Sequence, residues 1–89
     1  MANVIAQIRI MPEGLEVDLN TLAAEVKKLG GQSIEMKPIA FGLKAVEAIF
    51  VVQDAEGGTE NIEEKLRSLE GVSSVEVVSL GREIEEFRG

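Results

Sequence analysis

The stretch that decides the fold is Leu43-Lys44-Ala45-Val46-Glu47-Ala48-Ile49-Phe50-Val51-Val52. Side chains of a β-strand alternate between its two faces, and here both faces are almost entirely apolar. Such a strand is typical of the middle of a sheet, where neighbouring strands and a covering layer remove it from water. We therefore predict a central strand here. One face would carry Val46, Ala48, Phe50 and Val52, and the other Ala45, Glu47, Ile49 and Val51.

The chain before this strand predicts two further strands with a helix between them. Asn3 to Met11 alternates polar and apolar side chains, as a half-buried strand does. Asp18 is the expected N-cap of the helix, and Gly30-Gly31 is its expected end. Gln32 to Lys37 is predicted to be a strand that stops at Pro38 or lies at a sheet edge, because proline cannot donate a hydrogen bond to a ladder. The apolar positions that recur at helical spacing are Leu19, Leu22, Ala23, Val26 and Leu29.

The chain after the central strand predicts one more helix and one more strand. The helix is expected to begin at a cap formed by Thr59 or Asn61 and to stop at Gly71. Ser73 to Leu80 is the expected last strand. The tail, residues 83–89, is expected either to dock on the domain or to fray.

This order of elements, βαββαβ, predicts a ferredoxin-like α+β sandwich. Right-handed crossovers place both helices on one face of a four-stranded antiparallel sheet, with the first and third strands in its middle. A chain of 89 residues suffices for one hydrophobic core, so we expect a single domain over residues 1–89. Its core would span about residues 3–82, with residues 83–89 as a C-terminal tail.

The composition narrows the choice of partners. The chain has 16 acidic and 9 basic residues, which gives a net charge of −7. Because phosphate backbones would repel such a chain, we expect no direct binding to nucleic acid. The first residues lack the basic and apolar regions of a signal peptide, and no apolar stretch reaches the roughly 20 residues that span a bilayer. We therefore expect a cytoplasmic protein without membrane contact.

The residue types argue against an enzyme. The chain contains no cysteine and no histidine, which removes thiolate nucleophiles, imidazole bases and the usual zinc sites. Ser73, Ser74 and Ser79 lie on or beside a predicted strand without an evident base. Gly57-Gly58 lacks the lysine and the hydroxyl residue that complete a phosphate-binding loop. We expect no catalytic residue, no metal site and no cofactor.

The segment between the second and third predicted strands is the best candidate for a working surface. Lys37-Pro38-Ile39-Ala40-Phe41-Gly42-Leu43-Lys44 places three large apolar residues where turns normally carry Asn, Asp or Ser. Pro38 stiffens its start, and Gly42 allows the chain to reverse without a Cβ clash. Phe41 would either fill a partner's pocket, ringed by the two lysines, or fold back with Ile39 over the end of the core. The residues alone leave both possibilities open.

The stretch from Met36 to Ala45, followed by Phe50-Val51-Val52, resembles the exchange domain of the translation elongation factor 1-beta family. The run from Leu69 to Val77 is similar to that family's passage from the last helix to the last strand. The likeness covers roughly Val4 to Arg82 in the family's order. Its most specific part is the pattern Pro-Ile-x-Phe-Gly-Leu/Ile-Lys, which stands here at residues 38–44. The chain length is similar to that of short archaeal members.

The resemblance implies a guanine-nucleotide exchange factor, which releases GDP from elongation factor 1-alpha so that GTP can load and aminoacyl-tRNA can be delivered. Members of the family wedge the hairpin tip and the end of the last strand against the GTPase, near its magnesium and phosphate site. Carried over, Phe41 is the tip aromatic, and the partner-binding residues are residues 37–44 and Arg82. Arg82 takes the place of a lysine near the C-terminus of eukaryotic members, and Ala40 replaces a larger polar residue.

A second class of function stays open from the sequence. The ferredoxin-like fold hosts many functions, among them small-ligand-sensing and structural interaction domains. Such a domain would use the glycine-rich approaches to the helices for its ligand and would self-associate through its sheet, where Ile5, Ile49 and Val51 are expected on the open face. That interpretation predicts a stable homodimer, whereas the exchange factor is expected to be a monomer when free.

Overall fold

A computed structural model describes residues 3–53 and 59–82 of the chain. The elements follow one another in the expected βαββαβ order, with a short 3₁₀ turn added at the hairpin tip. Within these residues, no helix is long and apolar enough to cross a membrane. The bounds of the elements are β1 (Asn3–Pro12), α1 (Leu19–Lys28), β2 (Gln32–Pro38), η1 (Ala40–Gly42), β3 (Lys44–Gln53), α2 (Thr59–Arg67) and β4 (Val72–Arg82).

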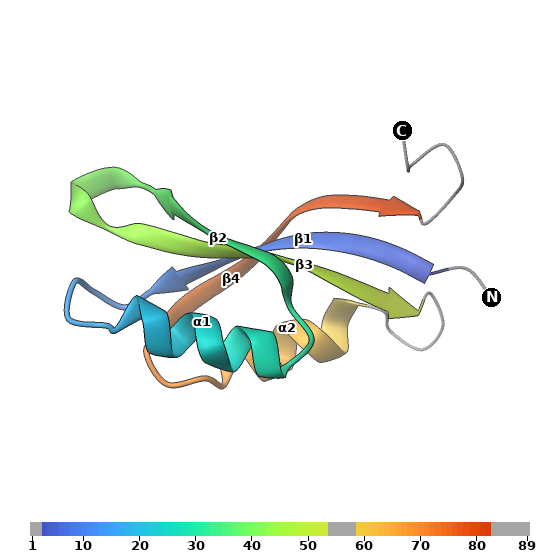
Figure 1. Ribbon diagram of the computed structural model, residues 1–89, viewed down its shortest axis with the longest axis horizontal. Coiled ribbons are helices and arrows are strands. Elements are labelled where there is room, and N and C mark those ends of the chain that lie inside the picture. Colours follow the sequence, from blue (N-terminus) through green and yellow to red (C-terminus); the bar gives the residue numbers. More distant parts are fainter. Residues whose placement is uncertain (1–2, 54–58, 83–89) are drawn as a thin grey trace.

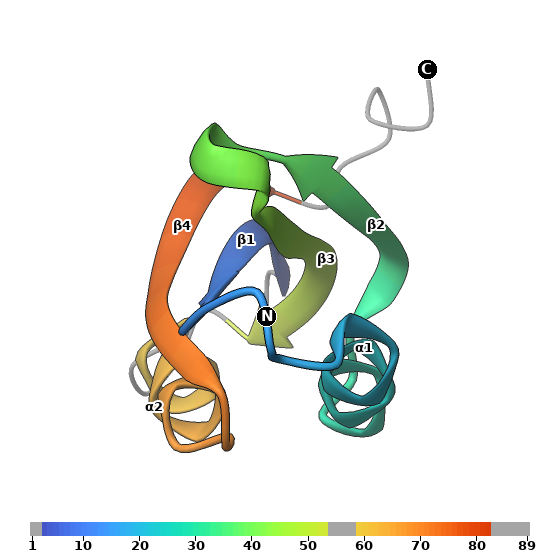
Figure 2. The same ribbon diagram turned by 90° about the vertical axis from the view of Figure 1, so that its left-hand side faces the viewer.

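The four strands form one antiparallel sheet in the order β2-β3-β1-β4, which puts the first and third strands in the middle as predicted. Both helices lie on one face of the sheet, and the other face is open (Figure 1, Figure 2). Ile10 lies opposite both Val46 and Val75, so three strands turn apolar side chains toward the helices in one layer. The predicted ferredoxin-like α+β sandwich is confirmed.

The core lies between the sheet and the two helices. Ile8 and Ile10 of β1 and Phe50 of β3 are buried there, in one cluster with Val26 of α1 and Leu66 of α2. Each such side chain contributes roughly 1.5–3 kcal/mol by leaving water. The apolar pattern that predicted a central third strand therefore reflects real burial of β3. The other members of the cluster are Ala6, Leu22, Val46, Ala48, Ile62 and Val72.

The starts of the two helices differ in how well the sequence predicted them. The Asp18 carboxylate accepts hydrogen bonds from the backbone N–H groups of Asn20 (3.0 Å) and Thr21 (3.4 Å), which confirms it as the N-cap of α1. The predicted cap of α2 is wrong, because Thr59 and Asn61 are both already helical. The helix carries Glu60 in its first turn, where the positive end of the helix dipole stabilises a negative charge.

The last strand is longer than predicted. Gly81 and Arg82 extend β4 because they pair with Ile5 and Val4 of β1. The predictions for the tail, residues 83–89, lie outside the described part of the chain. The sheet thus has two distinct ends, one formed by the β2–β3 hairpin and the other by the end of β4 (Figure 1).

Candidate functional site

The tip of the β2–β3 hairpin, residues 39–43, is held in shape by its own backbone. The Ile39 N–H donates to the Leu43 carbonyl oxygen (2.8 Å), and the Leu43 N–H donates to the Ala40 carbonyl oxygen (3.2 Å). Phe41 and Gly42 both adopt left-handed backbone conformations, with φ of 63° and 76°. Glycine adopts this region freely, whereas a residue with a Cβ loses roughly 1–2 kcal/mol there. The turn therefore fixes the direction in which the Cβ of Phe41 leaves the backbone.

Phe41 is 91% exposed, the highest value among the exposed large hydrophobic residues that the structure describes. It does not fold back over the core, which excludes one of the two possibilities that the sequence left open. The apolar residues on either side of it, Ile39 and Leu43, are half-buried. Among the three large apolar side chains of the tip, Phe41 is therefore the one that is fully available to a partner. An aromatic side chain held in water this way gains about 1.5–3 kcal/mol when a partner covers it.

The two lysines that flank the tip differ in their surroundings. Nζ of Lys37 lies 3.1 Å from a carboxylate oxygen of Glu35. The hydrogen bond and the charge of that carboxylate raise the pKa of Lys37. Lys44 is exposed and forms no ion pair with any residue that the structure describes. Positive charge thus lies on both sides of the tip, and that of Lys37 is partly neutralised.

The structure does not bring Arg82 together with the hairpin tip. Arg82 pairs with Val4, which also pairs with Val52, whereas the tip joins β3 at Lys44. The eight residue steps along β3 from Lys44 to Val52 span about 26 Å. The two predicted contacts therefore lie at opposite ends of the sheet. The side chain of Arg82 lies outside the described part of the molecule.

A polar network that the sequence analysis did not predict lies on the open sheet face. Nε of Arg9 donates to one carboxylate oxygen of Glu47 (2.8 Å), and the side-chain amide of Gln7 donates to the other (2.9 Å). Glu47 is only 5% exposed. The hydrogen bond from Arg9 lowers the pKa of Glu47, although burial acts in the opposite direction. Glu76 extends the network, 3.8 Å from Arg9.

The network was missed because it depends on strand register. Arg9 lies opposite both Glu47 and Glu76, and no pattern within a single strand reveals that pairing. The available signal was a charged residue at the centre of each of two strands predicted to lie side by side. Both oxygens of Glu47 have donors, so the network satisfies itself and stabilises the fold rather than offering a reactive group.

The apolar residues considered for self-association lie beside this network. Ile5 pairs with Val51, and Ile49 lies opposite Gln7. Ile5 and Ile49 are half-buried, and Val51 is 42% exposed. The open face is therefore a mixed surface, with a short apolar region next to charged side chains.

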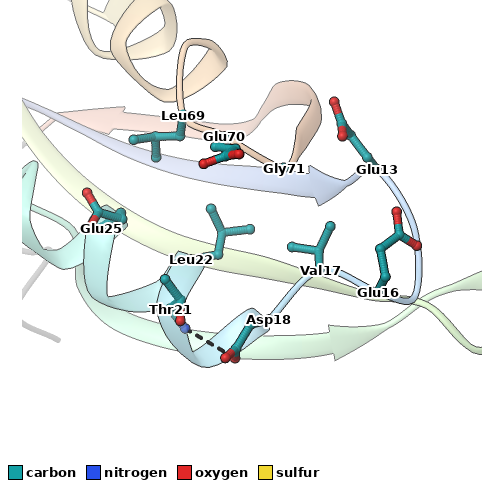
Figure 3. A pocket seen from close by; sticks show the side chains of 10 residues that line it. All are labelled: Glu13, Glu16, Val17, Asp18, Thr21, Leu22, Glu25, Leu69, Glu70 and Gly71. Carbon is teal, nitrogen blue, oxygen red and sulfur yellow. Dashed lines mark hydrogen bonds between the residues drawn. The ribbon is translucent and has the colours of Figure 1, made fainter.

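Two hollows lie at the hairpin end of the molecule. The first, of about 520 Å³, lies between α1 and the turn from α2 to β4 (Figure 3). The second, of about 240 Å³, lies between the β1–α1 loop and the base of the hairpin. Val17 lines both. No group of acidic residues within the described ranges is arranged to hold a metal ion. The carboxylates around the first hollow belong to Glu13, Glu16, Asp18, Glu25 and Glu70.

Comparison with known proteins places the whole described fold in one family. The family model of the EF-1 guanine nucleotide exchange domain matches residues 5–82, a span that includes the hairpin tip and β4. A protein named elongation factor 1-beta from Methanocella arvoryzae is 48% identical over 87 residues, which cover 92% of this chain and 98% of the relative.

Two further relatives of the same name agree. The elongation factor 1-beta of Methanothermobacter thermautotrophicus is 45% identical over 87 residues, covering 92% of this chain and 98% of the relative. That of Methanococcoides burtonii is 44% identical over 89 residues, covering 94% of this chain and the entire relative. This agreement over nearly full length, together with the match across the exposed hairpin, shows that the chain belongs to the EF-1 guanine nucleotide exchange domain family.

Proposed function

We propose that this chain is a guanine-nucleotide exchange factor that promotes GDP release and GTP loading on translation elongation factor 1-alpha, and so supports aminoacyl-tRNA delivery. Its family supports the exchange role in elongation. The observation that carries the proposal is the exposure of Phe41, 91%, on a turn closed by its own hydrogen bonds. A rigid exposed aromatic is suited to anchor an interface, because little conformational freedom is lost when it binds.

In this proposal Phe41 enters an apolar pocket of the GTPase, and residues 37–44 form the contact around that pocket. An exchange factor must bind the nucleotide-free partner more tightly than the nucleotide-bound one, and nucleotide then weakens its binding by the same factor. An acceleration of about a thousandfold requires roughly 4 kcal/mol of barrier lowering. Burial of one phenylalanine contributes about 1.5–3 kcal/mol, so Phe41 needs a second contact.

Arg82 is the second contact that we propose, following its place near the end of the last strand. A partner that reaches both contacts must extend along the sheet over about 26 Å. The guanidinium of arginine is always charged and pairs with carboxylates or phosphates in a planar fork, which suits competition at a metal and phosphate site. An Arg82→Ala variant is expected to lower the maximal exchange rate while the binding contributed by Phe41 persists.

We further propose that the chain has no catalytic residues of its own, requires no cofactor and acts as a monomer in the cytoplasm. Acceleration would then come from binding energy alone. The polar network supports the monomer, because it places charged side chains in the middle of the face through which a dimer would form. Sedimentation tests this point. A stable homodimer at the concentrations used for exchange would favour the sensing or structural alternative.

Release of fluorescent GDP from elongation factor 1-alpha tests the proposed function. The chain is titrated against a fixed amount of the loaded GTPase, and the release rate is followed until it saturates. The titration separates the concentration for half-maximal acceleration, which reports binding, from the maximal rate, which reports how far the bound factor lowers the barrier. Release as slow as that of the GTPase alone, at every concentration of the chain, would contradict the proposal.

A further inference from the structure

A second exposed apolar residue lies near the hairpin tip. Leu15, in the loop between β1 and α1, is 73% exposed. This loop and the hairpin tip lie at the same end of the sheet in two perpendicular views (Figure 1, Figure 2). A single exposed leucine is ordinary on a protein surface. The residues around Leu15 indicate whether it belongs to a contact surface.

Most of the side chains that line the hollow between the β1–α1 loop and the hairpin are apolar, and Lys44 is the charged exception. Leu15 and Val17 line it from the loop, and Leu43 and Lys44 line it from the hairpin. Its volume, about 240 Å³, lies below the roughly 300–1,000 Å³ of small-molecule sites. A protruding apolar side chain of another protein fits this shape better than a separate small molecule does. Phe41 would meet the same protein surface from the adjacent hairpin.

The larger hollow on the other side of Val17 adds charge to this surface. Its floor is apolar, and its lining contains carboxylates but no basic side chain (Figure 3). Within the described residues, Glu13, Glu16 and Glu70 take part in no ion pair. Lysine and arginine side chains cover apolar surface with their stems while their charged ends stay at the rim. A basic segment of a partner therefore complements both the floor and the rim.

The wall that the two hollows share, formed by the β1–α1 loop, is held by contacts within the fold. The Glu13 N–H donates to the Gly71 carbonyl oxygen (2.9 Å), which ties the β1–α1 loop to the turn before β4. Gly71 has a φ of +88°, and a Cβ there would lie 3.2 Å from the side chain of Val17. Glycine permits this conformation and this close approach. A surface held in advance loses little conformational freedom on binding.

The hairpin tip by itself is too small for a stable interface. The chain exposes 5820 Å² over 89 residues, about 65 Å² per residue on average. At that average the eight proposed contact residues 37–44 supply roughly 520 Å², whereas each partner in a standard interface buries about 800 Å². The β1–α1 loop, which lines one hollow together with the hairpin, offers additional surface at this end.

We propose that the β1–α1 loop, residues 13–18, and the two hollows beside it form a further contact surface for the GTPase partner. The segment that fits this surface carries an apolar side chain, which enters the hollow between Leu15 and Leu43, and basic side chains, which lie over the carboxylates of Glu16 and Glu70. This inference rests on the proposed function, because the hairpin tip and the loop contact the same partner. The surface adds to the binding that Phe41 contributes.

The GDP-release titration on the full chain tests this inference with two variants. Leu15→Ala removes the apolar contact, and we expect the half-maximal concentration to rise roughly five- to tenfold. The double variant Glu16→Gln/Glu70→Gln removes two rim charges, and we expect a rise of roughly three- to tenfold that shrinks at high salt. The maximal rate should stay that of the wild type in both, in contrast to Arg82→Ala. All three replaced side chains are exposed, and thermal unfolding verifies that the variants are folded.

Matched controls come from surfaces away from the hairpin end. Val51→Ala shortens an exposed apolar side chain on the open face, and Glu60→Gln/Glu64→Gln removes two exposed charges from α2. Both are expected to titrate like the wild type. If the loop variants behave like these controls while the wild type accelerates release, the inference is overturned and the proposed function stands. If the wild type itself does not accelerate release, the proposed function fails and the inference fails with it.

Discussion

The hairpin tip and the polar network on the open face place their unusual residues in opposite environments. At the tip, the apolar side chain of Phe41 is 91% exposed, while in the network the charged side chain of Glu47 is only 5% exposed. The tip is closed by backbone hydrogen bonds that do not involve the Phe41 side chain. The network, by contrast, consists of side chains that bond to one another. Folding therefore depends on the side chain of Glu47 and not on that of Phe41.

This difference indicates where to look for a binding function in this chain. The buried carboxylate of Glu47 already accepts hydrogen bonds from Arg9 and Gln7, so its hydrogen bonds serve the fold. The exposed side chain of Phe41 does not stabilise the fold by burial. It leaves water only when a partner covers it, and the free energy of that burial then stabilises the complex. Each region therefore predicts its own kind of defect on mutation, one in exchange and the other in stability.

Phe41→Ala is expected to have the largest effect. Removing the aromatic anchor should slow GDP release at subsaturating concentrations by roughly 30- to 100-fold, the equivalent of about 2–3 kcal/mol. The free energy of unfolding in urea should stay within about 0.5 kcal/mol of the wild type, because the side chain is exposed. Phe41→Leu is the control, since a smaller apolar side chain should retain part of the acceleration. If Phe41→Ala accelerated exchange as well as the wild type does, or were clearly less stable, the contrast between the two regions would be wrong.

Glu47→Gln tests the opposite side of the comparison. This substitution removes the charge that holds Arg9, and we expect the free energy of unfolding at pH 7 to fall by about 1.5–2 kcal/mol. Exchange activity of the folded protein should be unchanged, because Glu47 lies on the open face, away from the hairpin tip. Urea unfolding and the GDP-release titration measure the two quantities on the same samples. A loss of exchange without a loss of stability would show that the network belongs to the binding surface.

Glu47→Gln also tests how the free energy of unfolding depends on pH. The folded state lowers the pKa of Glu47 below its ordinary value of 4.5, so its ionised form stabilises the fold above that value. As the pH falls through the lowered pKa, the carboxylate becomes protonated in both states and this stabilisation is lost. The difference in unfolding free energy between wild type and Glu47→Gln should therefore shrink below pH 4.5. A difference that stays constant in acid would contradict the role assigned to the charge.

The same contrast explains what the sequence could predict. The order of the elements and the central position of β3 followed from local periodicity, and Asp18 capped α1 as expected because capping involves residues only two or three apart. The candidate segment also followed from its apolar residues between two lysines. These features depend on neighbours in the chain, so sequence patterns record them.

Features that depend on distant residues could not be predicted. The bond between Arg9 and Glu47 joins residues 38 positions apart through the register of two strands. The exposure of Phe41 depends on a left-handed backbone that the sequence permits but does not require. The distance between Arg82 and the tip became evident only from the pairing of Val4 with both β3 and β4. Two of these features rest on the pairing of strands, and the exposure of Phe41 rests on the backbone conformation of one turn.

The smallest expected effect separates the two lysines that flank the tip. Lys44 has no ion pair within the described residues, whereas Lys37 lies 3.1 Å from Glu35. Lys44→Ala should therefore raise the half-maximal concentration for exchange roughly two- to threefold at low salt, and less at high salt. Lys37→Ala should change it less, because Glu35 already offsets much of that charge. If both variants raised the half-maximal concentration equally, the Glu35–Lys37 ion pair would have to open when the partner binds. The part of the hairpin that contacts the partner would then extend back into β2.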